Sequence, residues 1–223
     1  KEIWSDPAQV ESLLDFARQH NLTDLYCQVQ YDYANGVATL ELADQQRAFL
    51  AAAHRAQLKI HALDGFAEYV LPENHERLFQ LVAALDRFNR AGPADAHYDA
   101  LHLDNEPYLV PAWKNPATRQ SVIDAYLALN RELGRRANAA GMEFGLDIPF
   151  WFDQRDASGA YKFTVETATG RIPLLEALFG CVQNAGIMSY RDRVTGRNGI
   201  IGLCATEFEL GARMGVDVFA SVE

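Results

Sequence analysis

The sequence predicts a (β/α)8 (TIM) barrel that lacks a complete first and eighth strand in this chain. Short apolar segments alternate regularly with amphipathic helical segments, which is typical of a parallel sheet covered by helices. No GxGxxG or GxxxxGK turn follows any of these segments, and this favours a barrel over a nucleotide-binding doubly wound sheet. The expected strand-to-helix loops are long and the helix-to-strand joints are tight, so one face of the barrel should carry the function.

The elements follow from hydrophobic spacing and from helix start and stop signals. Asp6 and Pro7, for example, are a helix cap and a first helical residue. The expected helices are 7–20, 44–57, 73–90, 116–140, 173–183 and 205–214, and the expected strands are 25–29, 58–63, 100–104, 142–148, 187–190 and 216–222. We number these strands second to seventh, so the two others would be neighbours in the closed ring and leave a gap at one seam.

Composition indicates one well-packed domain over residues 1–223, because 49% of the residues are hydrophobic and 22% are charged. The formal net charge of −10 argues against nucleic acid or an anionic membrane surface as a partner. No apolar run reaches the ~20 residues that a membrane-spanning helix needs. Cys27, Cys181 and Cys204 have no metal-binding or redox spacing, and we expect buried free thiols.

The most informative stretch is the expected strand 100–104 and the residues that follow it. Side chains alternate along a strand, so His102, Asp104 and Glu106 should project to one face while Leu101 and Leu103 pack on the other. Burying ionisable groups costs several kcal/mol each unless they are paired or hydrogen-bonded. Three such groups in register at the end of a strand therefore indicate a functional site.

Polar residues also lie at or just after the ends of the other expected strands. Together with the acids above they are Gln28, Gln30, His61, Asp64, Asp147, Tyr190, Arg191, Asp192 and Glu223. The adjoining loops carry aromatic residues, namely Tyr31, Tyr33, Phe66, Tyr69, Tyr108, Trp113, Trp151, Phe152 and Tyr161. Aromatic plates with carboxylates and amides between them suit sugar rings, which have apolar faces and polar rims. The alternative for the aromatic residues is that they pack the loops onto the barrel.

Glycoside hydrolysis needs a proton donor at the leaving oxygen and a second group that attacks or stabilises the anomeric carbon. Glu106 is the expected donor. Asp104 lies on the same face of the strand, and its like charge should favour the protonated form of Glu106.

The stretch from Asp99 to Glu106 resembles the DxxDxDxE strand of chitinase-like glycosidases, with His102 in place of the middle Asp. Met188-Ser189-Tyr190 resembles the Met-x-Tyr-Asp strand of the same group, with Arg191 inserted before Asp192. This resemblance implies that Asp104 orients a substrate N-acetyl group that acts as the nucleophile. It further implies that Glu106 is acid and then base, and that Tyr190 supports the oxazolinium-like intermediate.

Asn105-Glu106-Pro107 is similar to the fourth-strand Asn-Glu-Pro of clan A retaining glycosidases. That resemblance implies a different mechanism, in which Glu223 at the end of the seventh strand is the nucleophile and Asp104 only tunes Glu106. We favour the pair Glu106 and Glu223, because the fourth and seventh strands face each other across the mouth of a barrel. The expected substrate-binding residues are Gln28, His61, His102, Tyr108, Asp147, Trp151, Tyr190 and Arg191.

The resulting hypothesis is a glycoside hydrolase that acts on an oligo- or polysaccharide, without a cofactor or a metal ion. Such a substrate favours an extracytoplasmic or secreted location. One alternative is a metal-dependent barrel enzyme with ligands among His61, Asp64, His102, Asp104, Glu106 and Asp147, although no His-x-His or HExxH motif is present. The other is a non-catalytic carbohydrate-binding barrel, in which Arg191 or neighbouring groups satisfy the acids.

Overall fold

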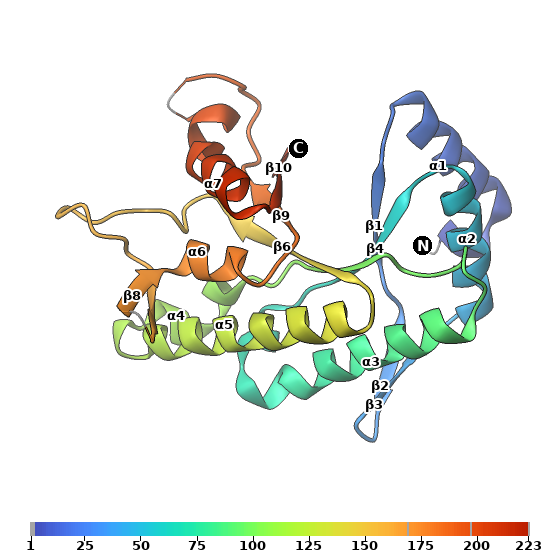
Figure 1. Cartoon of the computed structure of the whole chain (residues 1–223), viewed down its shortest axis with the longest axis horizontal. Coiled ribbons are helices and arrows are strands. Elements are labelled where there is room, and N and C mark those ends of the chain that lie inside the picture. Colours follow the sequence, from blue (N-terminus) through green and yellow to red (C-terminus); the bar gives the residue numbers. More distant parts are fainter. Residues whose placement is uncertain (1–2, 169, 197, 223) are drawn as a thin grey trace.

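The core of the protein is one curled parallel sheet, seen in a computed structural model that describes residues 3–168, 170–196 and 198–222 (Figure 1). Its strand order is β1-β4-β5-β6-β9-β10, and every neighbouring pair is parallel. The strands are β1 (Asp24–Gln28), β4 (Lys59–Asp64), β5 (Ala100–Leu103), β6 (Glu143–Pro149), β9 (Asn184–Met188) and β10 (Asp217–Ser221). The described residues thus form the six expected parallel strands, as a curled half-barrel sheet.

Helices follow the strands and cover the convex side of the sheet (Figure 1). They are α1 (Pro7–Gln19), α2 (Ala43–Arg55), α3 (His75–Ala91), α5 (Pro116–Ala139), α6 (Leu174–Phe179) and α7 (Ile200–Met214), with a short α4 (Pro111–Lys114) before α5. Helices α3 and α5 lie side by side and bury apolar residues such as Leu81, Leu85 and Leu133. None of the described helices is long and apolar enough to span a bilayer.

Most helices and strands begin and end within a few residues of the expected positions, and capping residues explain several of these ends. The Asp6 carboxylate accepts hydrogen bonds from the backbone N–H groups of Ala8 and Gln9, which begins α1 as expected. Gly215 ends α7 with a φ of 74°, a backbone conformation that glycine adopts without strain. Helix α6 is shorter than predicted and ends at Phe179, and β9 begins at Asn184, three residues before the expected strand.

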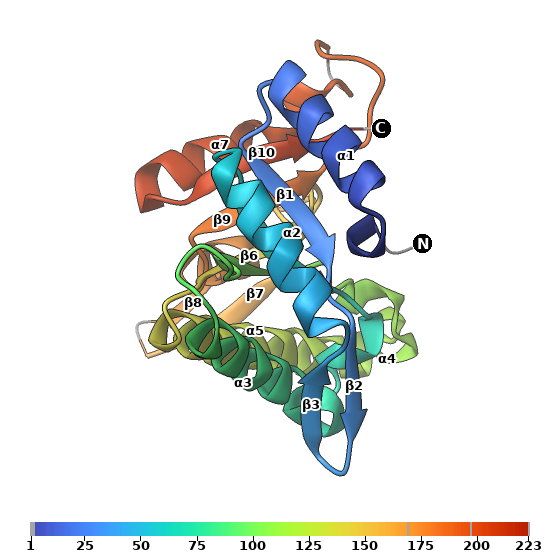
Figure 2. The same cartoon turned by 90° about the vertical axis from the view of Figure 1, so that its right-hand side faces the viewer.

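Two β-hairpins occupy stretches that the sequence analysis treats as loops. The first pairs β2 (Tyr31–Ala34) with β3 (Val37–Leu40) and projects away from the sheet (Figure 2). Its turn is Asn35-Gly36, where both residues have positive φ, the signature of a two-residue hairpin. The second pairs β7 (Thr164–Thr167) with β8 (Gly170–Pro173). The Asn-Gly pair is the sequence signal for the first hairpin, and reading the stretch only as a loop was wrong.

The concave side of the sheet is filled by a layer of four rings, Tyr26, His61, His102 and Phe219, which we call the inner layer. The Tyr26 ring stacks on His61 at a centroid distance of 4.3 Å and lies 4.8 Å from His102. It also lies 5.6 Å from Phe219. Tyr26 belongs to β1 and Phe219 to β10, the two edge strands of this sheet, so the contact holds the sheet in its curl.

Two glycines on the same face make room for the inner layer. A Cβ atom on Gly145 would lie 1.9 Å from Asn184 Oδ1 and 2.5 Å from His102 Nδ1. A Cβ atom on Gly186 would lie 2.8 Å from the Phe219 ring. Such distances are far inside van der Waals contact, so the rings occupy the space that side chains at these positions would need.

The three cysteines are free thiols, as predicted. Cys204 is buried, whereas Cys27 and Cys181 are only partly buried.

We expect the substitution Gly145→Ala to lower the free energy of unfolding by about 1–3 kcal/mol, because the added methyl group overpacks the inner layer against His102 and Asn184. Urea unfolding measures this change. Gly180→Ala is the matched control, since a Cβ atom there meets its nearest neighbour at an ordinary 3.4 Å. Equal urea midpoints for the two variants would contradict the proposed packing.

Candidate active site

Acidic side chains gather at the carboxyl ends of β5 and β6. Asp104 follows the last residue of β5, and Asp147 lies in β6, with one carboxylate oxygen 3.3 Å from His102 Nε2. Burial raises the pKa of Asp104 to about 6, and the negative charges of Asp147 and Glu106 contribute to the shift. Asp104 Oδ1 is buried and has no hydrogen-bond partner among the described residues. Asp104 is therefore a partly buried carboxyl group at the carboxyl end of β5, with a raised pKa and, as far as the described residues show, an unused oxygen.

Glu106 lies beside the half-buried Tyr108, which in turn contacts Trp151. The Tyr108 hydroxyl group donates a hydrogen bond to Glu106 Oε1, and burial together with this contact raises the pKa of Tyr108. The ring of Tyr108 meets the edge of Trp151, with a centroid distance of 5.0 Å. A carboxyl group thus lies directly next to an aromatic wall, which is the combination that carbohydrate sites use.

The loop aromatic residues divide into two groups. Tyr69, Trp113 and Phe152 are buried, and Trp113 stacks on Phe152 at 5.9 Å. For these three, packing of the loops onto the barrel is the observed role. Others keep partly open faces, namely Tyr31, Tyr33, Phe66, Tyr108, Trp151 and Tyr161.

Asp64 and Gln28 form hydrogen bonds that connect the loops to the end of β4. The Asp64 carboxylate accepts hydrogen bonds from Tyr31 Oη at 2.9 Å, from the Gly65 N–H group at 2.8 Å and from Tyr69 Oη at 3.3 Å. Gln28 Nε2 donates to the same carboxylate at 3.3 Å. These contacts tie the β2–β3 hairpin to the end of β4. Gln28 is exposed, and its predicted contact with substrate stays a prediction.

Arg191 forms hydrogen bonds with the backbone of its own loop. Its Nη1 atom donates to the backbone carbonyl groups of Tyr190 at 3.0 Å and Ser189 at 3.2 Å, and its guanidinium group lies over the Phe150 ring. Tyr190 has a φ of 28°, its backbone N–H group donates to Ser221 of β10, and 45% of the residue is exposed. Tyr190 is thus presented at the carboxyl end of the sheet, where it was expected. Glu223 lies outside the described residues.

His61 faces the amino ends of the strands and not the carboxyl cluster. It is fully buried, its Nε2 atom is 2.8 Å from Asp24 Oδ1 at the start of β1, and burial lowers its pKa. This pair borders a polar cavity of 480 Å³ at the amino ends of the strands. Its lining includes Asp24, Lys59, His61, Glu143, Asn184 and Asp217. This cavity was not expected from the sequence, since all candidate functional side chains were expected at the carboxyl ends of the strands.

The structure does not group the candidate ligands of the metal-dependent alternative, as far as the described residues show. Its six candidate residues, from His61 to Asp147, do not bring three ligand atoms within 4.8 Å of one another in the described ranges. Asp64 is saturated by the donors described above, and His61 faces Asp24.

Sequence reasoning also missed Glu207, a fully buried carboxyl group in α7. Neither of its oxygens has a hydrogen-bond partner among the described residues. Burial raises the pKa of Glu207 to about 8, and the nearby Asp153 charge adds to the effect. A signal was present, because Cys204, Glu207 and Leu210 share the buried face of the helix at helical spacing.

Comparison with solved structures finds a similar fold in two chitinases and a spore cortex-lytic enzyme. A chitinase from Chromobacterium violaceum aligns with a TM-score of 0.54 and 14% identity over 94% of this chain. A chitinase from Rhizomucor miehei gives 0.55 and 13% over 90%, and the spore cortex-lytic enzyme SleL of Bacillus megaterium gives 0.57 and 13% over 95%. The chain spans 63%, 62% and 46% of the lengths of these three proteins, respectively. Identities this low establish the fold alone.

No protein-family model matches the sequence, and no curated protein matches it significantly.

The raised pKa of Asp104 predicts a pH-dependent effect of Asp104→Asn. A folded-state pKa of about 6, above the usual 3.8, means that wild-type stability falls as the pH rises from about 4 through 6. The neutral amide should therefore match the wild type near pH 4 and exceed it by roughly 1–2 kcal/mol at pH 8. Urea unfolding at both pH values measures the difference, with the exposed Asp32→Asn as control. A stability difference that does not change with pH contradicts the assignment.

Glu207→Gln should stabilise the protein at high pH for the same physical reason. Because the pKa of Glu207 is raised to about 8, the wild type loses stability as the pH rises from about 5 to 9. We expect the variant to be more stable by at least about 1 kcal/mol at pH 9 and to show little change at pH 5. Thermal unfolding at the two pH values measures this, with the exposed Glu209→Gln as control. A Glu207→Gln variant that is less stable than the wild type at pH 9 would show that the carboxylate has a partner.

Proposed function

We propose that the protein is a glycoside hydrolase that acts on a polysaccharide of N-acetylated amino sugars. The observation that carries the proposal is the cluster of three carboxyl groups, Asp104, Glu106 and Asp147, at the ends of two adjacent strands. The Tyr108 and Trp151 rings beside Glu106 supply apolar surface for a sugar face. Shared fold with chitinases and a cortex-lytic enzyme supports the same substrate class.

In the proposed reaction Glu106 is the general acid and base. It donates a proton to the glycosidic oxygen as the C–O bond breaks, and the carbonyl oxygen of the substrate acetamido group attacks the anomeric carbon. Asp104 accepts a hydrogen bond from the acetamido N–H group and stabilises the positive charge of the resulting oxazolinium ion. Glu106 then removes a proton from water as that water opens the ring. Tyr190 is the expected supporting hydroxyl group.

The pairing of Glu106 with Glu223 as nucleophile stays a prediction. Both mechanisms retain anomeric configuration, so stereochemistry does not separate them. They differ in their need for the substrate acetamido group, which only the substrate-assisted reaction requires.

His102 supports a second candidate function, a barrel that binds sugar without hydrolysing it. This histidine occupies the position of the middle Asp of the strand motif, is fully buried, and lies 3.1 Å from Asn184 Oδ1. Its contacts make it part of the inner layer, so the acid expected next to Asp104 on that strand is absent.

We expect Glu106→Gln to lower kcat on N-acetylated chito-oligosaccharides by about 100- to 10,000-fold, with little change in substrate affinity, because it removes the proton donor. Fluorogenic chito-oligosaccharides and reduced peptidoglycan glycan strands are suitable substrates. Glu209→Gln, an exposed acid on α7, is the matched control and should keep full activity.

Two further comparisons complete this experiment. Glu223→Gln should retain activity, and analogues without the acetamido group should not be cleaved. Loss of activity in Glu223→Gln with cleavage of such analogues would favour the direct nucleophile. Binding of sugar by a wild-type protein that hydrolyses none of these substrates would favour the binding barrel.

A further inference from the structure

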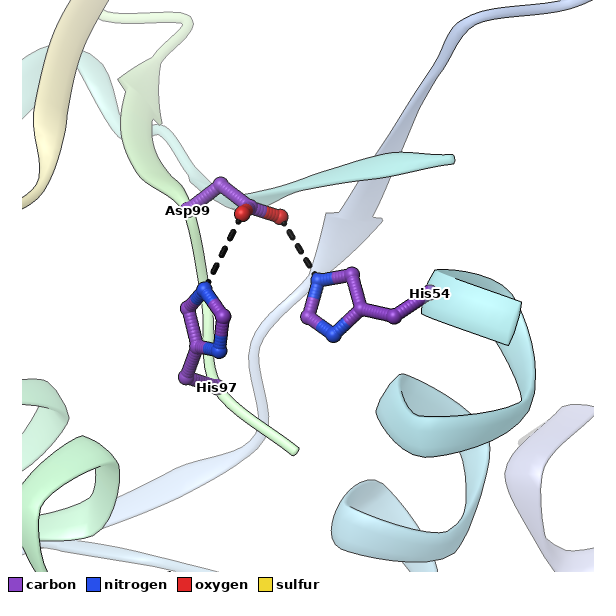
Figure 3. Close-up of side chains that lie close together, drawn as sticks. All are labelled: His54, His97 and Asp99. Atoms are coloured by element: carbon purple, nitrogen blue, oxygen red, sulfur yellow. Dashed lines mark hydrogen bonds and ion pairs between the residues drawn. The ribbon is translucent and has the colours of Figure 1, made fainter. Parts of the chain in front are cut away.

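Two histidines and an aspartate converge at the amino ends of the strands, on the outside of the curl and away from the carboxyl cluster. We call this group the His–His–Asp cluster; it consists of His54, His97 and Asp99 (Figure 3). His54 lies in the last turn of α2, and the other two precede β5. Figure 3 shows the Asp99 carboxylate between the two imidazole rings, with one oxygen directed to each. The ligand atoms of the three residues lie within 4.8 Å of one another.

Backbone carbonyl groups fix the tautomer of each ring. His54 Nδ1 lies 2.7 Å from the carbonyl oxygen of Asp95, and His97 Nδ1 lies 2.7 Å from that of Ala94. A carbonyl oxygen only accepts hydrogen bonds, so both Nδ1 atoms carry a proton. In a neutral imidazole the other nitrogen, Nε2, then presents its lone pair.

Both Nε2 atoms face the same carboxylate, each next to a different oxygen. The distances are 3.0 Å from His54 Nε2 to Asp99 Oδ2 and 3.1 Å from His97 Nε2 to Asp99 Oδ1. Neutral imidazole nitrogens and carboxylate oxygens all present electron pairs here, so the arrangement needs a positive charge at its centre. Two protons or one metal ion would each supply that charge.

The geometry fits a metal ion. Around a tetrahedral zinc ion with bonds of about 2.0–2.1 Å, neighbouring ligand atoms lie about 3.3 Å apart. The two Nε2–oxygen distances above are near this value, each to a different oxygen of Asp99, and the ligand atoms of all three residues lie within 4.8 Å. Metal-binding histidines usually donate their second N–H group to a carbonyl or carboxylate, as both rings do here. Asp99 Oδ2 is itself held by the Ile60 N–H group at 2.7 Å. The ligands are therefore oriented by a surrounding set of hydrogen bonds.

We propose that the His–His–Asp cluster binds one divalent transition-metal ion of the zinc class. Two imidazole nitrogens and a carboxylate favour zinc over the oxygen-preferring magnesium and calcium. The His97 side chain is 38% exposed, so a water molecule can complete the coordination. The ion would join the end of α2 to the start of β5 and, through Ile60, to β4, which makes it a structural link.

The test uses tag-free protein that has been treated with a chelator and then titrated with Zn²⁺ by calorimetry. We expect one equivalent to bind, and saturating Zn²⁺ to raise Tm by about 5–10 °C at 100 times Kd. His97→Ala and His54→Ala should each weaken binding by at least about 100-fold and abolish the Tm shift. His20→Ala is the control, because His20 is exposed at the end of α1.

Circular dichroism of each variant in chelator establishes that it is folded. Asp99→Asn provides a second check with the shape of the side chain retained, and Co²⁺ substitution reports ligation directly through its visible absorption, which should be lost in the same variants. A wild-type chain that binds no Zn²⁺ would overturn the proposal and leave two protonated imidazoles paired with Asp99. Equal Zn²⁺ affinity in the wild type, His54→Ala and His97→Ala would also overturn it.

Discussion

Tyr26 and Phe219 stand on the two edge strands of the sheet, and their rings meet inside its curl. With His61 and His102 they form the inner layer, for which Gly145 and Gly186 leave the necessary space. Polar groups lie on both sides of this layer, toward the carboxyl ends and toward the amino ends of the strands. The carboxyl cluster lies on one side of it, and the cavity lined by Lys59 and Glu143 lies on the other.

His102 links the inner layer to the carboxyl cluster. It is fully buried, contacts Tyr26, and lies 3.3 Å from Asp147. Asp147 is in turn one of the charges that raise the pKa of Asp104. His102 therefore contacts both the inner layer and a carboxyl group of the candidate site.

Hydrophobic spacing and helix start and stop residues were sufficient to predict the parallel strands and the helices that cover them. The strand at 100–104 was predictable from its apolar residues and from the polar residues that follow it. The structure ends β5 at Leu103, so alternation along the strand does not by itself place Glu106. The partners of these groups were not predictable, since they depend on tertiary contacts. Asp64 illustrates this, because its donors come from residues 28 to 69 and the carboxylate serves the scaffold.

Residues with roles at the amino ends were missed for a related reason. His97 and Asp99 are two positions apart at the start of a strand, which is a visible local pattern. Its third member, His54, lies in a distant helix, and only the fold brings the three together. Similarly, Glu207 looks like an ordinary helical acid until its helix is packed against the sheet.

On the proposed function, sugar binds at the carboxyl end of β5, next to Glu106 and Trp151. The chain has three tryptophans, so their indole N–H signals in a ¹⁵N–¹H NMR spectrum can report the location of a bound chito-oligosaccharide. We expect a saturable shift of the Trp151 signal, with Trp4 unaffected. Binding that shifts Trp4 and leaves Trp151 unchanged would contradict it.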